Sequence, residues 1–374
     1  MKKYLWIVVI VVVVLIIAGV VSQKPTETGP IKLGFIGVLS GDGAPYGETE
    51  KNALEIARKE INDAGGIAGR LVEIVYEDGK CTGKDAISAI QKLLSVDKIN
   101  IILGAVCSSE TLAVAPVAEQ NKVLLFSAFS SSPLITDAGD YTFRNGPSDA
   151  DIAKLDANVL AAKYKKVAMI SENTDYSQSV RDIVNKILAE KGVSVVSDEN
   201  YNSGTKDFRA ILTKIKSTNP DVVYINPGTD TKAGGIIVKQ ARELGILTPL
   251  NGNFSLATQD AITAGGKYMN GVVSTDGTDL SQKGKDLILK YKQLYGKDPS
   301  VSYEMGASYD RLYIIKQAIE SVGTNPTKIK DYLYKMPDYS GTIGTYHFDK
   351  NGDVVGVGYI SIVLQDGKKI PLNQ

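Results

Sequence analysis

Two adjacent serines stand where a short apolar run gives way to a helical pattern, in the stretch Gly104-Ala-Val-Cys-Ser-Ser-Glu-Thr-Leu-Ala-Val-Ala-Pro116. The apolar residues 101–103 predict a buried strand, and the residues after Gly104 predict a helix. Ser108 or Ser109 then caps a helix start, where the first backbone N–H groups have no intrahelical partner. Such a site is suited to binding a carboxylate or a phosphate. A purely structural cap is the alternative interpretation.

Strands and helices alternate on both sides of this stretch. Apolar runs predict strands at 31–38, 71–76, 101–103 and 123–126, with helices at 46–64 and 85–96 between them. A second alternating series runs from residue 147 to residue 274, and helices follow at 283–295, 302–322 and 326–336. Residues 344–348 and 357–364, around Asn351-Gly352, are predicted as hairpin strands.

Apolar strands separated by amphipathic helices indicate parallel, doubly wound sheets covered on both faces. The two α/β series are similar in size and order, which predicts two such lobes facing each other. A ligand is expected in the cleft between the carboxyl ends of their strands.

Length and charge narrow the class of protein. The chain has 374 residues, enough for two or three domains. Lys plus Arg and Asp plus Glu both number 42, so the formal net charge is zero and no basic patch indicates a nucleic-acid partner. Hydrophobic residues make up 43%, as in ordinary globular proteins.

The N-terminus indicates export. Lys2 and Lys3 precede the apolar residues 5–21, which just reach the about 17 residues of a spanning helix and exceed a usual signal-peptide core. We therefore expect a signal or anchor segment at 1–23, a polar linker at 24–30 and a body outside the cytoplasm. The segment is either cleaved after export or tethers the body to the membrane.

The two cysteines fit that compartment. Cys81 and Cys107 each follow a predicted strand, and two cysteines in an exported protein favour one disulfide. Closing this loop would stabilise the fold by about 3–4 kcal/mol on the loop-entropy argument. Two unpaired thiols are the alternative.

Little in the sequence supports catalysis or cofactor binding. The glycine-rich stretch 37–47 lacks the spacing of a dinucleotide or phosphate-binding loop. His347, the single histidine, lies in a predicted strand, and no His, Cys or carboxylate cluster has metal-ligand spacing. An acid–base pair brought together across the cleft stays open as an alternative. Tyrosine numbers 19, and Tyr46, Tyr176 and Tyr309 are placed where they could line the cleft.

Several stretches together resemble the branched-chain amino-acid-binding proteins of ABC importers, which have the type I periplasmic-binding fold. The matching pieces cover residues 31–374 in order: Ile36-Gly-Val-Leu-Ser-Gly41 with Tyr46-Gly47, Glu60-Ile-Asn-Asp-Ala-Gly-Gly-Ile-Ala-Gly69, Tyr76-Glu-Asp with Cys81, Cys107-Ser-Ser, Asn173-Thr-Asp-Tyr176, residues 208–212, Asp221-Val-Val-Tyr224 and Tyr309-Asp310.

The resemblance implies two Rossmann-like lobes joined by a three-crossing hinge. The crossings are expected near Pro147, Thr275 and Tyr346. Lobe 1 would then comprise residues 31–147 plus 276–345, and lobe 2 residues 148–275 plus 346–374. The resemblance also implies the Cys81–Cys107 disulfide.

Site residues follow from the same resemblance. Ser108 aligns with a serine that binds the ligand's carboxylate, Ser131 with a hydroxyl-bearing residue, and Phe129 with a main-chain contact. Tyr46, Tyr176 and Tyr309 align with aromatic residues that close on the ligand.

Two positions depart from the family pattern. The acid that binds the ligand ammonium in leucine binders is replaced at Phe254, and a second-lobe tyrosine is replaced near Gly228. An ammonium buried without a partner is costly, so either Asp230 or Asp310 takes this role or the ligand lacks an amine.

The resulting hypothesis is an extracytoplasmic, monomeric solute-binding protein without catalytic activity, metal or cofactor. It would capture a small carboxylated ligand, in the first place an amino acid and possibly a branched-chain one, for the permease of an ABC importer. A membrane-tethered ligand sensor is the first alternative, although no second hydrophobic segment follows residue 31. An exported enzyme on the same fold is the second.

Overall fold

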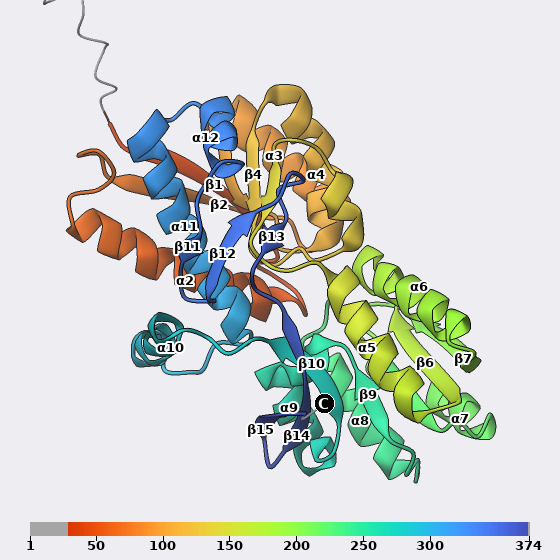
Figure 1. Cartoon of the computed structure of the whole chain (residues 1–374). Coiled ribbons are helices and arrows are strands. Elements are labelled where there is room, and N and C mark those ends of the chain that lie inside the picture. Colours follow the sequence, from red (N-terminus) through yellow and green to blue (C-terminus); the bar gives the residue numbers. More distant parts are fainter. Residues whose placement is uncertain (1–28, 373–374) are drawn as a thin grey trace, which may run out of the picture.

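The computed structural model describes residues 29–372 and shows two α/β lobes (Figure 1). The predicted signal or anchor segment and nearly all of the linker lie outside the described residues. Within residues 29–372 no helix combines the length and the apolar character needed to cross a membrane.

The first lobe is built on a parallel sheet with the strand order β2-β1-β3-β4-β5. Its elements alternate as predicted: β1 (Ile31–Gly37), α2 (Ala44–Asp63), β2 (Val72–Asp78), α3 (Gly83–Ser95), β3 (Ile101–Gly104), α4 (Ser108–Asn121), β4 (Leu124–Ser127) and β5 (Thr142–Arg144). One face of the sheet packs on α3 and α4, and the other packs on α2 and α11. Apolar strands buried on both faces explain their nearly continuous Val, Ile, Leu and Phe content.

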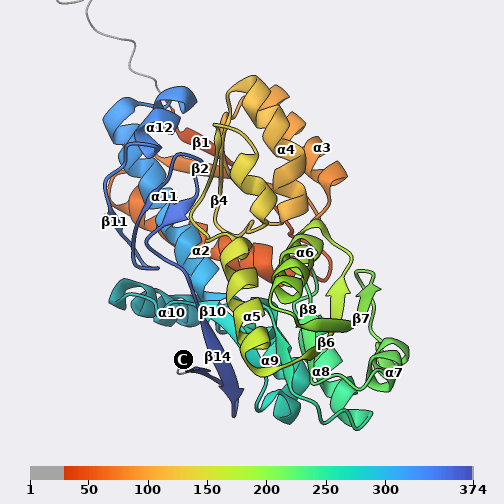
Figure 2. The same ribbon diagram turned by 45° about the vertical axis from the view of Figure 1, so that its right-hand side comes forward.

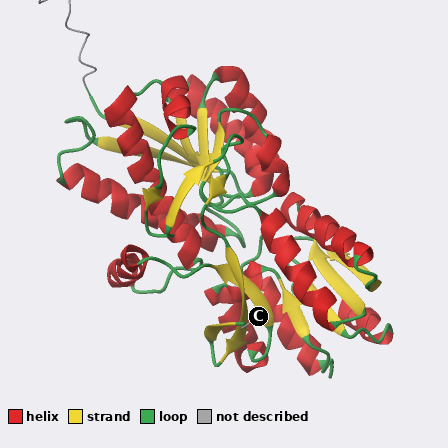
Figure 3. Cartoon of the chain, in the orientation of Figure 1, coloured by secondary structure: helices red, strands yellow, loops and turns green. Residues whose placement is uncertain are grey.

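The second lobe repeats this plan. Its elements are α5 (Asp149–Lys163), β6 (Lys166–Glu172), α6 (Asp175–Glu190), β7 (Ser194–Tyr201), α7 (Arg209–Ser217), β8 (Val222–Asn226), α8 (Ala233–Glu243), β9 (Leu250–Gly252), α9 (Gln259–Gly265) and β10 (Val273–Gly277). Helices α5 and α6 cover one face of the sheet, and α7, α8 and α9 cover the other. Figure 3 shows the strands of each lobe enclosed by helices.

The C-terminal part of the chain serves both lobes. Helices α10 (Gln282–Tyr295), α11 (Ser302–Val322) and α12 (Pro326–Leu333) follow β10, and all three pack on the first lobe. Strands β14 (Tyr359–Gln365) and β15 (Lys368–Pro371) extend the second sheet as an antiparallel edge, giving the order β15-β14-β10-β9-β8-β6-β7.

A small antiparallel sheet lies between α12 and β14 in the chain. It contains β11 (Tyr339–Ser340), β12 (Thr345–Phe348) and β13 (Val354–Val355). The hairpin predicted for residues 344–348 and 357–364 is therefore wrong. The turn at residues 349–353 brings β13, and not β14, onto β12, and β14 pairs with β10 instead.

The small sheet also bears on where the chain crosses between the lobes. Tyr346 and Phe348 are buried in the core of the first lobe, so the third passage follows β13 and not Tyr346. The other two passages follow β5 and β10. The turned view in Figure 2 shows β10 and β14 passing from the region of α11 into the second lobe.

The two lobes touch across the cleft. The Ser132 hydroxyl on the first lobe lies 3.2 Å from the Ser179 hydroxyl on α6. The Lys206 ammonium on the second lobe contacts the Asp42 carboxylate on the first at 2.9 Å and the Asp230 carboxylate on its own lobe at 2.6 Å. The structure is therefore a closed arrangement of the lobes.

Candidate ligand-binding site

A cavity lies where the carboxyl ends of the parallel strands of both lobes meet. This is the position at which open α/β sheets bind ligands. The residues that line the cavity come from the loops after strands and from helix starts of both lobes: Tyr46, Cys81, Cys107, Ser108, Ser109, Phe129, Ser131, Thr174, Tyr176, Gly228, Thr229 and Phe254.

Most of the predicted binding residues meet at this cavity. Ser108, Ser131, Phe129, Tyr46 and Tyr176 all line it, although they are far apart in the sequence. Each follows a strand or begins a helix, so the topology of the two sheets brings them together.

Tyr309 and Asp230 are not among the lining residues. Tyr309 lies in the middle of α11, and its hydroxyl donates a hydrogen bond to Glu60 of α2. Asp230 is buried, and its carboxylate accepts hydrogen bonds from the Lys206 ammonium and the Lys232 amide. Neither side chain therefore contacts the cavity directly.

The first-lobe wall is formed by the start of α4. Cys107 is the N-cap, so Ser108 and Ser109 are the first two helical residues, and the prediction that a serine is the cap is wrong by one or two positions. The Cys107 amide donates to the Glu110 side chain at 2.8 Å, while the next amides stand at the open helix end. The positive end of the helix dipole therefore faces the cavity beside the Ser108 hydroxyl.

Cys81 and Cys107 form a disulfide with their Cα atoms 5.3 Å apart, as the sequence predicted. The Ser109 hydroxyl donates to the Cys81 carbonyl at 2.9 Å, and Glu110 accepts from the Cys81 amide at 2.8 Å. Burial raises the pKa of Glu110 to about 7, although both backbone N–H donors favour its ionised form. The disulfide and Glu110 thus fix the loop after β2 against the start of α4.

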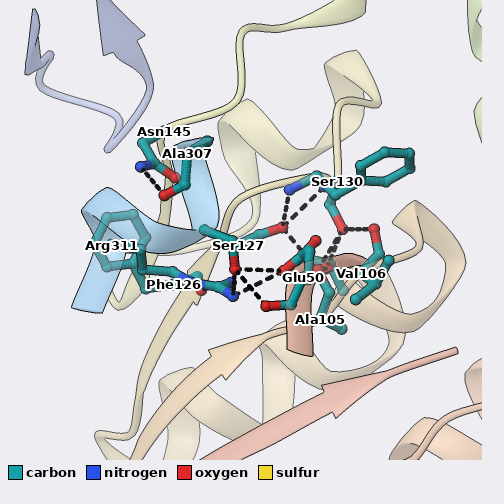
Figure 4. A network of polar contacts seen from close by, with 12 residues as sticks. Glu50, Ala105, Val106, Phe126, Ser127, Ser130, Asn145, Ala307 and Arg311 are labelled. Atoms are coloured by element: carbon teal, nitrogen blue, oxygen red, sulfur yellow. Dashed lines mark hydrogen bonds and ion pairs between the residues drawn. The ribbon is translucent and has the colours of Figure 1, made fainter. Parts of the chain in front are cut away.

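A buried polar network supports the loop that carries Phe129 and Ser131 (Figure 4). The hydroxyls of Ser127 and Ser130 donate to the Ala105 carbonyl at 2.7 and 2.9 Å. The Ser127 hydroxyl in turn accepts from the Phe129 and Ser130 amides. These bonds join the loop after β4 to the loop after β3.

Beneath this network lies a fully buried ion pair. Arg311 on α11 contacts Glu50 on α2 at 2.7 Å and donates to the Phe126 carbonyl at 2.8 Å. Figure 4 shows Arg311 beside Phe126 and Glu50, with dashed lines for these contacts. The ion pair therefore anchors the end of β4, from which the ligand-facing loop departs.

The second-lobe wall is largely aromatic. Phe254 packs edge-on against Phe129 of the first lobe and against Tyr176, with ring centroids 5.9 Å apart in both pairs. Tyr46 and Phe129 approach to 4.8 Å, and burial raises the pKa of the Tyr46 hydroxyl. Four aromatic rings thus bound the cavity, two from each lobe.

A side chain at residue 228 would crowd the start of α6. A Cβ atom at residue 228 would lie 3.2 Å from the Tyr176 ring and 2.7 Å from the Ser177 hydroxyl. The loop that contains Gly228 is held by Glu172, which accepts from the Gly228 and Thr229 amides at 2.8 and 2.7 Å.

Thr174 and Thr229 line the cavity without having been predicted from the sequence, and Phe254 was predicted only as the replacement of an acid. A usable signal was present for Thr229, because the turn Asn226-Pro-Gly-Thr-Asp230 follows a buried strand at the same end of the sheet. Within the described part of the chain, no three His, Cys, Asp or Glu side chains gather as metal ligands.

This geometry defines a class: a two-lobed protein that encloses a small molecule between its lobes. The model of the family described as periplasmic binding protein matches residues 30–368. The chain belongs to this family. This is a family of solute-binding proteins rather than of enzymes. Membership implies that the protein acts outside the cytoplasm and that its ligands are small molecules.

Individual relatives agree with this assignment. An amino acid binding protein from Pseudomonas aeruginosa is 29% identical over 95% of this chain and 96% of that protein. The substrate-binding protein LivJ from Streptococcus pneumoniae, solved with isoleucine, is 28% identical with a TM-score of 0.81, covering 91% of this chain and 97% of that one. A solute binding protein from R. palustris solved with benzoate is 20% identical, with a TM-score of 0.82 over 92% and 96% of the two chains, and shares the fold.

Proposed function

We propose that this protein captures a small carboxylated molecule by closure of its two lobes and delivers it to the permease of an ABC importer. The observation that carries the proposal is the cavity enclosed between the lobes, with the open start of α4 on one wall and aromatic rings on the other. Amino acid binding proteins among its relatives support a carboxylated ligand.

In this proposal Ser108 and Ser131 bind the carboxylate. The Ser108 hydroxyl, the Ser131 hydroxyl and the amides at the start of α4 offer donors to an anion on the first lobe. Phe129 contributes through its main chain and ring, and Tyr46 flanks it. Tyr176 then arrives with the second lobe as the hinge closes.

The remaining parts of the proposal concern the chain as a whole. The protein acts as a monomer without a cofactor, and the N-terminal segment either tethers it to the outer face of the membrane or is cleaved after export. It releases its ligand chemically unchanged, which chromatography of the ligand after prolonged incubation would test.

Ser108→Ala provides the direct test of the carboxylate site. Removing one hydrogen bond to a charged group is expected to weaken ligand binding by about 1–3 kcal/mol. Isothermal titration of the full-length chain in mild detergent would measure this change. Ser88→Ala is the matched control, because Ser88 is exposed on α3 and its hydroxyl bonds only its own helix, at the Lys84 carbonyl. Equal affinities of the two variants would remove Ser108 from the site.

A further inference from the structure

The cavity is bounded without a charged side chain. None of its twelve lining residues is Asp, Glu, Lys or Arg. On the first lobe the open start of α4 supplies a positive field, but on the second lobe nothing among the lining residues supplies a negative one. A ligand with a carboxylate at α4 and an ammonium elsewhere would bury its cation without a counter-ion.

Two buried acids of the second lobe, Asp149 and Glu172, stand behind the cavity wall. Asp149 adjoins Ser131, whose carbonyl accepts from the Asp149 amide, but its carboxyl does not line the cavity, and burial raises its pKa to about 7, toward the neutral form. Glu172 is fully buried and accepts from the Ser203 hydroxyl at 2.6 Å and from two amides of the loop at residues 228–229. These amides stand between the Glu172 carboxylate and the cavity wall that Gly228 and Thr229 form.

Asp230 and Asp310 are the two acids that the sequence offers in place of the missing ammonium-binding acid. Asp230 is neutralised by the Lys206 ammonium at 2.6 Å. Asp310 accepts from the Thr342 amide at 2.8 Å inside the first lobe. Neither lines the cavity.

Glu110 on the first-lobe side is committed as well. Its two oxygens accept from the Cys81 and Cys107 amides, behind the disulfide that forms the wall. Glu110 also lies in the first turn of α4, on the wall that would bind the ligand's carboxylate. A ligand ammonium could reach this wall only by taking the place of that carboxylate.

The place opposite α4 is taken by Phe254. Its ring closes the gap between Phe129 and Tyr176, so the wall offers apolar surface and ring edges where an ammonium would need an acceptor. Such a wall suits an aromatic or branched aliphatic body.

From this distribution of charge we infer that the site selects carboxylates with an apolar body and no ammonium group. The inference rests on the proposed capture of a carboxylate and narrows its ligand class. An ammonium ion loses its hydration on closure and finds no ionic partner among the lining residues, whereas the same carbon skeleton without the amine does not bear this cost.

Matched ligand pairs test the inference on the unmodified protein. Leucine is compared with isocaproate, which is leucine without its amino group, and phenylalanine with hydrocinnamate. Isocaproamide, which lacks the carboxylate, and benzoate complete the series. Titration of the full-length chain, unfolded and refolded to remove any carried ligand, is expected to give isocaproate and hydrocinnamate about tenfold or more tighter binding than their amino acids.

The outcomes separate the inference from the proposed function. If leucine or phenylalanine binds as tightly as its deaminated partner, the inference is overturned while carboxylate capture stands. If isocaproamide binds as well as isocaproate, the carboxylate site fails and the inference fails with it. Absence of binding by every ligand of the series overturns both.

A pair of variants at Phe254 tests the origin of the preference. Phe254→Glu supplies the missing acid and is expected to shift the leucine-to-isocaproate affinity ratio toward leucine by about tenfold or more. Phe254→Gln has the same size without the charge and should leave the ratio near that of the natural protein. An unchanged ratio in a folded Phe254→Glu variant would contradict the inference, and the ligand pairs above remain decisive if that variant does not fold.

Discussion

The two walls of the cavity are built differently. The first-lobe wall is cross-linked by the Cys81–Cys107 disulfide, by serine hydroxyls that join two loops, and by the buried pair of Glu50 and Arg311. The second-lobe wall has neither a disulfide nor a fully buried ion pair among the described residues, and its loops are joined by the neutral Asn253 amide, which donates to the Tyr176 hydroxyl and the Pro227 carbonyl. Its loop at residues 228–229 is held by the carboxylate of Glu172, which binds backbone amides and not a cation.

The difference matches what each wall has to do. A site that binds an anion through backbone amides and a helix end depends on fixed geometry, because these donors cannot follow a displaced ligand. A wall of aromatic rings tolerates small displacements, since dispersion and apolar burial have little directionality. The first lobe therefore supplies the directional contacts that recognise the ligand, and the second lobe covers the ligand with apolar surface.

The largest expected effect comes from breaking the ion pair of the first lobe. Arg311→Met leaves Glu50 as an uncompensated buried acid and is expected to lower the free energy of unfolding by about 3–5 kcal/mol. Denaturant unfolding would measure the loss. Arg58→Met is the matched control, because Arg58 pairs with Glu55 at a partly exposed site and should cost less than about 1 kcal/mol. Equal losses in both variants would contradict the special role of the buried pair.

A smaller effect is expected at the corresponding place in the second lobe. Glu172→Gln removes the charge from the two hydrogen bonds to the Gly228 and Thr229 amides, with an expected loss of about 1–3 kcal/mol in unfolding free energy. Glu190→Gln, at the exposed end of α6, is the control. A loss of unfolding free energy as large as that of Arg311→Met would show that the two walls are equally constrained, contrary to the difference described above.

The smallest effect is expected between the walls. Lys206→Met removes the contact of the second lobe with Asp42, but the Lys206 side chain is 56% exposed, so ligand affinity should fall by less than about 1 kcal/mol. The effect should shrink further in concentrated salt, because exposed ion pairs are screened. A large, salt-independent loss would instead indicate that Lys206 also supports the buried Asp230.

The sequence predicted the alternation of strands and helices because strands buried on both faces leave unbroken apolar runs, as in β1 and β8. It missed β5 and β9, which have three residues each and are too short to produce such a run. It paired the last strands wrongly because a turn signal at Asn351-Gly352 does not specify which strand returns to which sheet.

Site residues were predictable where topology alone decides. Ser108, Ser131 and Tyr176 follow strands at the carboxyl edge of their sheets, so any doubly wound arrangement brings them to the cleft. Tyr309 could not be placed in this way, because its position in the middle of α11 leaves the face of the helix undetermined until α11 packs on α2. The engagement of Asp230 by Lys206 depends on two side chains from different loops and has no signature in the sequence.

The ion pair beneath the first lobe also constrains the order in which the chain completes its fold. Glu50 and Arg311 are 261 positions apart, and Arg311 reaches the Phe126 carbonyl across 185 positions. Contacts of such sequence separation form slowly, because a long loop must close first. The parallel strands of the second lobe are contiguous from β6 to β10, so during synthesis from the N-terminus they are complete before α11 exists. The parallel strands of the second lobe are thus made before the helix that completes the buried ion pair of the first, although β14 and β15 complete the second sheet only at the end of the chain.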